Sequence, residues 1–276
     1  MQLTTSSYTH LTAHGRGPLT DLLKPDETRE ALETFGFAVT RSPSPTVSTA
    51  HAHREMAVIR ADLDLGEPYV PILYRESDQP TVTEVTRKAG SDHPVFHTGA
   101  AQGWHTDGLL EDIGTIRTTL LYCVRPAHRG GRTALLNAGR VFAELRADDP
   151  EAADVLLSDT ILGRRSTLPG VEREAVGPVF ADLGDGTYAT RYGEGRVERW
   201  HPRGPAQRAA LDRALRHFRA RRSDPDVRID LLLGAGQCLI FRNDLLSHSR
   251  EDFVDDPLRP RLLLRSLHTD APRTTP

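Results

Sequence analysis

Short β-rich runs separated by turn residues dominate the sequence, and they restrict the fold more than any other feature. Strands are expected over Phe37–Thr40, Thr81–Arg87, Ile116–Val124, Thr133–Leu136, Val227–Leu233, Cys238–Phe241 and Arg261–Leu267, and between Glu172 and Tyr192 around the hairpin signal Gly184-Asp185-Gly186. Helices are expected over Pro25–Phe35, Thr49–Leu63, Ala138–Arg146, Pro150–Leu157 and Pro205–Arg222. Many short strands with a few flanking helices predict a mainly β, double-sheet or barrel architecture.

Composition limits the class of protein. The 276 residues fit one domain, with a loose lead-in over residues 1–20 and a tail over 268–276. The net charge is −3 and arginines are scattered among acids, which argues against nucleic-acid binding. Apolar runs are too short for a bilayer and the start lacks a signal-peptide pattern. Two cysteines in apolar runs predict buried free thiols, and with them a reducing, cytoplasmic location. We expect the partner of the protein to be a small-molecule substrate. The sequence does not predict the oligomeric state.

The stretch Gly103–Gly108 contains the first candidate metal ligands. His105 and Asp107 are two residues apart, so in an extended backbone both side chains point to one face. The same His-x-acid spacing recurs at His53, inside an expected helix where such residues do not face each other, and at His268, in the expected tail. Only His105 precedes a strand-like run with partners downstream. An ordinary hydrogen-bonded surface pair is the alternative reading.

A third ligand is expected in the second half of the chain. The candidates there are His201, His217, His248 and His268. His201 lies in a loop, His217 lies on the arginine-rich side of a helix, and His248 follows a strand and a turn, which makes it the best candidate. His93 and His97 fall in an irregular stretch and are expected to be solvated.

Two histidines and one aspartate leave three coordination positions open, an arrangement typical of non-haem Fe(II) oxygenases. A bidentate 2-oxo acid would fill two positions and leave the third for O2. If that acid has a second carboxylate, an arginine would suit it. Arg261 lies 13 residues after His248, and Arg265 lies four further along the same strand, on the same face. Both could instead be ordinary arginines on the outside of the strand.

Several stretches resemble the Fe(II)/2-oxoglutarate-dependent dioxygenases of the taurine dioxygenase and clavaminate synthase-like group. They are Leu32–Val39, Trp104–Gly108, Gly130–Thr133, Leu233–Phe241 with Asn243, His248–Arg250 and Arg261–Arg265. The resemblance implies a double-stranded β-helix (jelly roll) with Fe(II), 2-oxoglutarate as co-substrate and O2. It also implies that iron is bound by His105, Asp107 and His248, that 2-oxoglutarate is bound by Thr133 and Arg261, and that Arg265 borders the substrate or co-substrate.

The sequence departs from this family at two positions. Arg242 stands where the family usually has Asp, and Ser249 stands where Gly is common. Neither supplies a metal ligand, so the departures concern the local turn. Related halogenases lack the carboxylate that Asp107 provides, so its presence predicts hydroxylation, ring closure or desaturation.

The substrate is the least constrained prediction. Trp104, Arg191 and Tyr192, and also Tyr74 with Arg75, are candidates to line its pocket, with packing or sheet-surface roles as the alternative. We expect a small polar substrate, an amino acid or amino sugar, in bacterial specialised metabolism such as antibiotic biosynthesis. The competing functions are a non-catalytic jelly-roll metal-binding protein and a zinc hydrolase.

Overall fold

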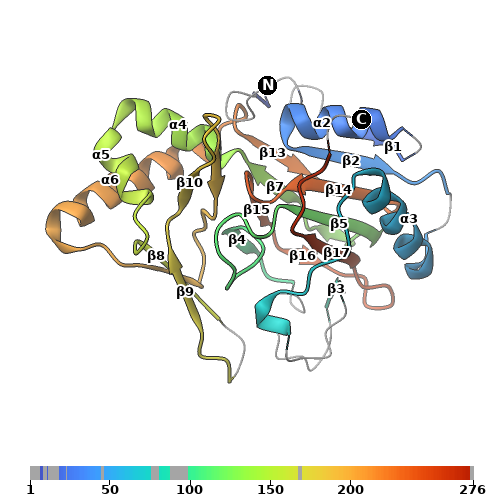
Figure 1. The fold of residues 1–276 in the computed structure, drawn as a ribbon. Coiled ribbons are helices and arrows are strands. Elements are labelled where there is room, and N and C mark those ends of the chain that lie inside the picture. Colours follow the sequence, from blue (N-terminus) through green and yellow to red (C-terminus); the bar gives the residue numbers. More distant parts are fainter. Residues whose placement is uncertain are drawn as a thin grey trace.

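The computed structural model describes residues 7–8, 11, 19–22, 24–44, 47–75, 81–87, 99–166 and 170–273 (Figure 1). Two sheets form its centre. The larger has the strand order β1 (Leu19–Asp21), β2 (Phe37–Arg41), β14 (Gln237–Arg242), β5 (Thr118–Arg125), β17 (Leu262–His268) and β3 (Val82–Thr86). The smaller has the order β13 (Arg228–Leu231), β7 (Thr133–Leu136), β15 (Ser247–Arg250) and β4 (Gln102–His105). This is the predicted double-stranded β-helix.

Strand alternation divides the apolar side chains among three layers. Inward-facing residues of both sheets, Phe241 and Leu263 from one and Leu135 from the other, share a buried core between the sheets. Outward-facing residues of the larger sheet pack under α2 (Pro25–Phe35) and α3 (Thr49–Asp62). The chemistry described below lies on the inner face.

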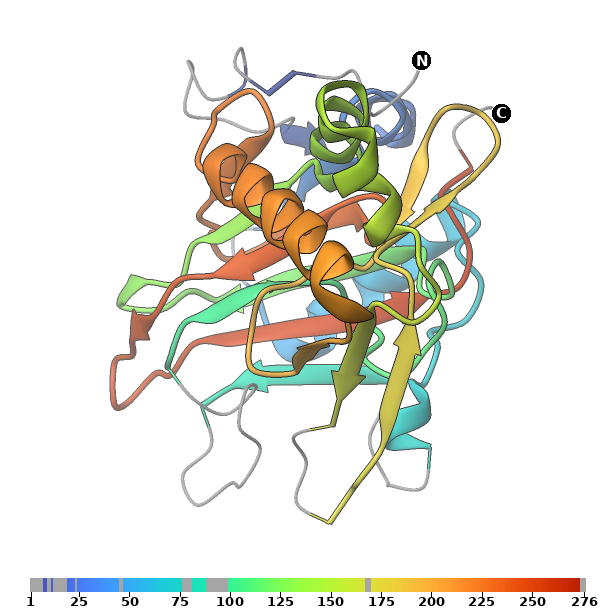
Figure 2. The same cartoon turned by 90° about the vertical axis from the view of Figure 1, so that its left-hand side faces the viewer.

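The third layer of apolar side chains lies on the outer face of the smaller sheet. It contains α4 (Ala138–Asp148), α5 (Pro150–Leu156), α6 (Gly204–Arg221), the sheet of β12 (Glu198–Trp200), β8 (Leu162–Arg165) and β9 (Glu174–Gly177), and the hairpin of β10 (Phe180–Asp182) and β11 (Tyr188–Thr190). Figure 2 looks onto this layer, with α6 in front of the strands. The hairpin confirms the turn predicted at Gly184–Gly186. The remaining short ladder pairs β6 (Arg129–Gly130) with β16 (Phe253–Val254).

The expected helices form largely at the predicted positions because their end signals are local. α2 has Pro25 in its first turn and ends at Gly36, whose φ of 75° lets its N–H bond to the Leu32 carbonyl. α3 begins after Ser48, whose side chain accepts from the His51 N–H. Among the described residues, no helix has the length and apolar character needed to cross a membrane.

The predicted loose lead-in is wrong at the two residues described near its start. Tyr8 is fully buried, its hydroxyl donates to the Phe35 carbonyl over 2.9 Å, and its ring meets Phe37 edge-on. Ser7 donates to Asp226 over 2.9 Å. The chain is anchored here because an aromatic side chain enters the inter-sheet core.

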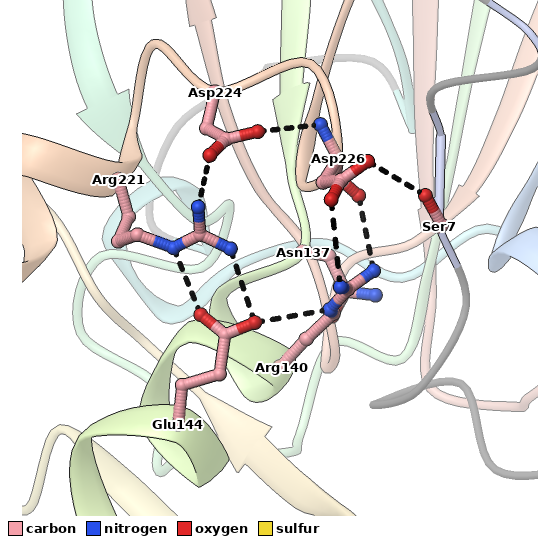
Figure 3. Close-up of polar contacts among 7 residues, drawn as sticks. All are labelled: Ser7, Asn137, Arg140, Glu144, Arg221, Asp224 and Asp226. Carbon is pink, nitrogen blue, oxygen red and sulfur yellow. Dashed lines mark hydrogen bonds and ion pairs between the residues drawn. The ribbon is translucent and has the colours of Figure 1, made fainter. Parts of the chain in front are cut away.

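Figure 3 shows the polar network that Ser7 joins through Asp226. Its members are Ser7, Asn137, Arg140, Glu144, Arg221, Asp224 and Asp226. Glu144 on α4 accepts from Arg140 of the same helix (3.1 Å) and from Arg221 at the end of α6 (2.9 Å). The same two arginines also reach the segment that leads into β13, where Arg140 lies 3.9 Å from the Asp226 carboxylate and Arg221 pairs with Asp224.

The predicted tail is wrong at His268. This residue ends β17, where it lies opposite Thr118 of β5, and it is fully buried. Its Nδ1 lies 3.1 Å from the Leu65 carbonyl and its Nε2 lies 3.0 Å from the Ser266 hydroxyl. Because a carbonyl only accepts, Nδ1 carries the proton and Nε2 accepts from serine.

Candidate active site

The three predicted ligands come together at the edge of the smaller sheet that is formed by β15 and β4. His105 ends β4 and lies directly opposite His248 on β15, with ring centroids 4.0 Å apart. Asp107 follows β4, and its Oδ2 lies 3.8 Å from Nε2 of His248. One ligand atom from each residue falls within 4.8 Å of the other two. Two imidazoles and one carboxylate at this spacing form a donor set that suits Fe(II).

The backbone sets the orientation of His105. Its Nδ1 lies 2.8 Å from the Gly103 carbonyl, so Nδ1 donates and the lone pair of Nε2 remains on the opposite side of the ring. That Nε2 is 2.7 Å from the amide nitrogen of Gln102, which donates to it. Burial lowers the pKa of both His105 and His248, and the neighbouring His248 lowers that of His105 further. Neutral imidazole is the form that binds a metal.

Asp107 is buried yet ionised. Burial alone would raise the pKa of its carboxyl, but Arg265, the two histidines and a hydrogen bond from Thr119 outweigh that effect and lower it to about 2. Nη1 of Arg265 lies 2.6 Å from Oδ1, and the Thr119 hydroxyl donates to Oδ2 over 3.0 Å. The carboxylate is therefore held in its metal-binding form.

Asn243 joins the two halves of the site. Its side-chain oxygen accepts from the Asp107 N–H over 2.7 Å, and its amide donates to the carbonyls of Ile116 (2.9 Å) and Asp107 (3.3 Å). The unusual Arg242 beside it pairs with Asp244 through two contacts of 2.7 and 2.8 Å. This local ion pair explains how the turn accommodates arginine.

Thr133 and Arg261, the predicted 2-oxoglutarate residues, line one small cavity between the sheets, together with Cys123, Gly130, Gly131 and Leu263. A side chain at Gly130, where φ is 74°, would meet the Asp252 carbonyl at 2.4 Å, so the turn before Thr133 requires glycine. The sequence stretch that predicted Thr133 is thus also the stretch that shapes this cavity.

The Arg261 guanidinium is a buried cation without a carboxylate partner in the described part of the chain. The residue is 4% exposed, its Nη1 has no hydrogen-bond partner there, and its guanidinium lies 5.0 Å from the centre of the Phe253 ring. Burial, with Arg250 nearby, lowers its pKa to about 10, so it is still charged at neutral pH. A buried cation of this kind fits an anionic ligand.

Arg265 lies two residues along β17 from Leu263 of the cavity lining, so its side chain is on the same face of the strand, and its Nη1 is 2.6 Å from Oδ1 of Asp107. Tyr74, at the end of a short 3-10 helix over Ile72–Tyr74, faces the same region. Burial raises the pKa of its hydroxyl, and the Arg265 and Asp107 charges act on it in opposite directions.

The structure does not bring the other predicted substrate residues to the triad. Trp104 points to the opposite face of β4 from His105. It packs in the hydrophobic cluster formed with α4, α5 and α6, with Arg228 above its ring. Tyr192 is fully buried and stacks on Phe218, with centroids 4.4 Å apart. Arg191 donates to the carbonyls of Pro178 (2.7 Å) and Leu162 (3.1 Å). Substrate contact by these three residues stays a prediction, and their burial among core residues speaks against it.

The other candidate histidines that the structure describes do not join the cluster. His201 pairs with Glu174 over 3.1 Å, His217 lies half-buried on α6, and His268 ends β17. His93 and His97 lie outside the described residues.

Comparisons with known proteins agree with this site. The family described as "Taurine catabolism dioxygenase TauD, TfdA family" matches residues 5–267. A Streptomyces sp protein named "Uridine-5'-phosphate dioxygenase" is 78% identical over 273 residues, which cover 99% of each chain. An Amycolatopsis sp protein of the same name is 45% identical over 249 residues, 88% of each chain.

Solved structures share the fold at low sequence identity. The non-heme iron oxygenase OrfP in complex with Fe and alpha-ketoglutaric acid has a TM-score of 0.64 at 15% identity, covering 90% of this chain and 80% of its own. Asparagine oxygenase with Fe(II), hydroxyasparagine and succinate has a TM-score of 0.60 at 16% identity, covering 89% and 84%.

Proposed function

Since the chain belongs to the taurine catabolism dioxygenase TauD, TfdA family, we propose that uridine-5'-phosphate is the substrate that it oxidises. The protein is an oxidoreductase that uses Fe(II), 2-oxoglutarate and O2. The relative that is 78% identical over 99% of this chain carries the proposal of a nucleotide substrate, in place of the amino acid or amino sugar expected from the sequence. A non-catalytic metal-binding protein and a zinc hydrolase do not fit this family membership.

His105, Asp107 and His248 would hold the iron. Their donor atoms lie within 4.8 Å of one another, and the carboxylate is ionised while burial favours neutral imidazoles. When bound, Fe(II) supplies the activation of O2 that makes oxidation of a C–H bond possible. The chain's own contribution is to present three donors on one side and to keep the site shielded from bulk water by burial.

Thr133 and Arg261 would bind the co-substrate. 2-Oxoglutarate carries a carboxylate at each end, and one of these would lie against Arg261 while the other end reaches the metal. Arg261 is the buried cation whose Nη1 has no partner among the described residues. A carboxylate there would satisfy both its charge and its hydrogen-bonding capacity.

Arg265 would contact the phosphate of the substrate. It contacts the triad directly through Asp107, and a guanidinium offers five N–H donors in a planar fork that suits phosphate. Binding the phosphate beside the triad would place the sugar next to the reacting centre and reduce the entropy cost of reaching it.

Substrate-dependent formation of succinate tests this proposal. With Fe(II), 2-oxoglutarate and O2, we expect uridine-5'-phosphate to stimulate succinate formation and O2 consumption, and we expect uridine, which lacks the phosphate, to stimulate little of either. Equal stimulation by both compounds would contradict the role of the phosphate. No stimulation by uridine-5'-phosphate would contradict the substrate while leaving the cofactors untouched.

A further inference from the structure

Arg164 on β8 binds the metal-binding segment from outside the two main sheets. The residue is 3% exposed. Its Nη2 donates to the Thr106 carbonyl over 2.6 Å, and its Nη1 lies 3.3 Å from both the Thr106 hydroxyl and the Gly108 carbonyl. Thr106 and Gly108 are the residues on either side of Asp107. One planar guanidinium therefore binds the backbone immediately before and immediately after the proposed carboxylate ligand.

Asp107 needs such support because it lies beyond the end of β4, where strand pairing no longer fixes the backbone. Asn243 binds the N–H and the carbonyl of Asp107 itself, and Arg164 binds the two flanking carbonyls. Gly108 has a φ of 84°, and a side chain there would meet Ile116 at 2.7 Å, so this turn is also tightly packed. Charge-assisted hydrogen bonds shielded from water are among the stronger ones available to a protein.

The strand partner of Arg164 completes the attachment. Glu198 on β12 is paired with Arg164 in the register of the two strands, and its carboxylate accepts from the Gly195 N–H over 2.7 Å. The neighbouring Glu194 N–H donates to the Trp104 carbonyl on β4 over 2.9 Å. The loop that leads into β12 thus contacts the metal-binding segment at Trp104, and β8 contacts it at Thr106 and Gly108.

We propose that Arg164 is a positioning residue that fixes the Asp107 carboxylate for metal binding. This inference rests on the proposed role of Asp107 as an iron ligand. It assigns a function in the site to the outer β8–β12 sheet, which otherwise has the character of a packing layer. Arg164 itself touches neither substrate nor co-substrate in this account.

Arg191 provides a matched control in the same layer. It is also 3% exposed, and its guanidinium also donates to two backbone carbonyls, those of Pro178 and Leu162. Neither carbonyl belongs to the metal-binding segment. Replacing either arginine removes a buried guanidinium from the same outer layer, Arg164 from β8 and Arg191 from the end of the β10–β11 hairpin, but only the Arg164 change releases Asp107.

The test is anaerobic titration of the metal-free protein with Co(II), followed by visible absorbance, for the wild type and for R164K, R164Q and R191K. Removing a group that orients a ligand costs about 10- to 100-fold in metal affinity, and we expect that loss for R164Q. R164K should lose less, because its ammonium keeps the charge but cannot bind both carbonyls. R191K should bind Co(II) within about twofold of wild type, even though thermal unfolding shows a lower Tm, because the ligand segment is untouched.

Wild-type Co(II) affinity in folded R164Q, or an equal loss in R191K, would overturn the inference. If R164Q does not fold, R164K decides the question against R191K, with far-UV circular dichroism confirming that both are native. These outcomes are separate from the proposed substrate, because the titration contains no nucleotide. Failure of wild type itself to bind Co(II) would instead remove the triad assignment on which the inference rests.

Discussion

Arg261 and Arg265 lie four residues apart at the same inner face of the molecule, yet their surroundings are opposite. Arg265 contacts a carboxylate of the protein, Asp107, at 2.6 Å. Arg261 lies between an aromatic ring and a small cavity, with no hydrogen-bond partner for its Nη1 in the described part of the chain. The contact to Asp107 fixes the Arg265 guanidinium beside the triad, where its other N–H donors would face the substrate phosphate. Arg261, a buried cation without a carboxylate partner among the described residues, favours binding an anion from solution. The two residues should therefore affect different ligands.

The largest effect is expected at Arg261. R261M removes the proposed partner of the 2-oxoglutarate carboxylate, and a hydrogen bond to a charged group is worth about 1.5–3 kcal/mol. The KM for 2-oxoglutarate should rise about 10- to 150-fold. The KM for uridine-5'-phosphate should change little. Initial rates of succinate formation against each compound measure both values, and R261K should show an intermediate loss because it keeps the charge.

R265M is expected to give the complementary result. The KM for uridine-5'-phosphate should rise by about 10-fold or more, because a charge-assisted contact to phosphate is lost. The KM for 2-oxoglutarate should rise far less than in R261M. If the two variants give the same pattern, the division of labour between the two arginines is wrong.

A smaller effect is expected at Thr133. T133V keeps the shape of the side chain but removes its hydroxyl, and a neutral hydrogen bond contributes about 0.5–1.5 kcal/mol. The KM for 2-oxoglutarate should rise about 2- to 10-fold, in the same direction as R261M. T119V serves as the control at the other end, since Thr119 binds Asp107 rather than the cavity. A larger change in the 2-oxoglutarate KM for T119V than for T133V would contradict the assignment.

The smallest effect on catalysis is expected from replacing His268, at the far end of β17. This replacement should instead change how the free energy of unfolding depends on pH. Burial lowers the pKa of His268 from 6.5 to about 4, against the opposing hydrogen bond to Leu65. The unfolded state therefore binds more protons between pH 4 and 6.5, so stability is complete above pH 6.5 and falls as the pH drops through this window. The loss contributed by this group approaches about 3 kcal/mol at most.

Urea unfolding at several pH values measures this contribution. The slope of unfolding free energy against pH should be shallower between pH 4.5 and 6 in H268Q, and activity near neutral pH should be similar to wild type. An unchanged slope would mean that His268 is not buried as a neutral imidazole.

The inner face of the molecule was largely predictable from the sequence. His105 and Asp107 are two residues apart on an extended segment, and Arg261 and Arg265 share a strand face by simple alternation. His248 could be selected because a strand and a turn precede it. Local spacing and a family resemblance were sufficient there, because His105, His248 and Arg265 lie on strands, and Asp107 and Arg261 lie within two residues of a strand end.

The outer layer was not predictable in the same way. The β8 sequence Leu162-Gly163-Arg164-Arg165 has no apolar alternation, so neither the strand nor the burial of Arg164 was expected. Tyr192 resembled a pocket residue but packs in the core, because α6, more than ten residues further on, supplies Phe218. Arg164 contacts Thr106 from 58 residues further along the chain. The sequence contains no local pattern that predicts this long-range contact with the metal-binding segment.

The central claim is that three side chains bind one Fe(II) while Arg261 anchors 2-oxoglutarate beside it. Anaerobic addition of Fe(II) to the protein with 2-oxoglutarate tests this directly, because a 2-oxo acid chelated to the metal gives a weak visible charge-transfer band. The account predicts that the band saturates at one Fe(II) per chain in wild type and is absent in H248A. No band in wild type, or an undiminished band in H248A, would contradict it.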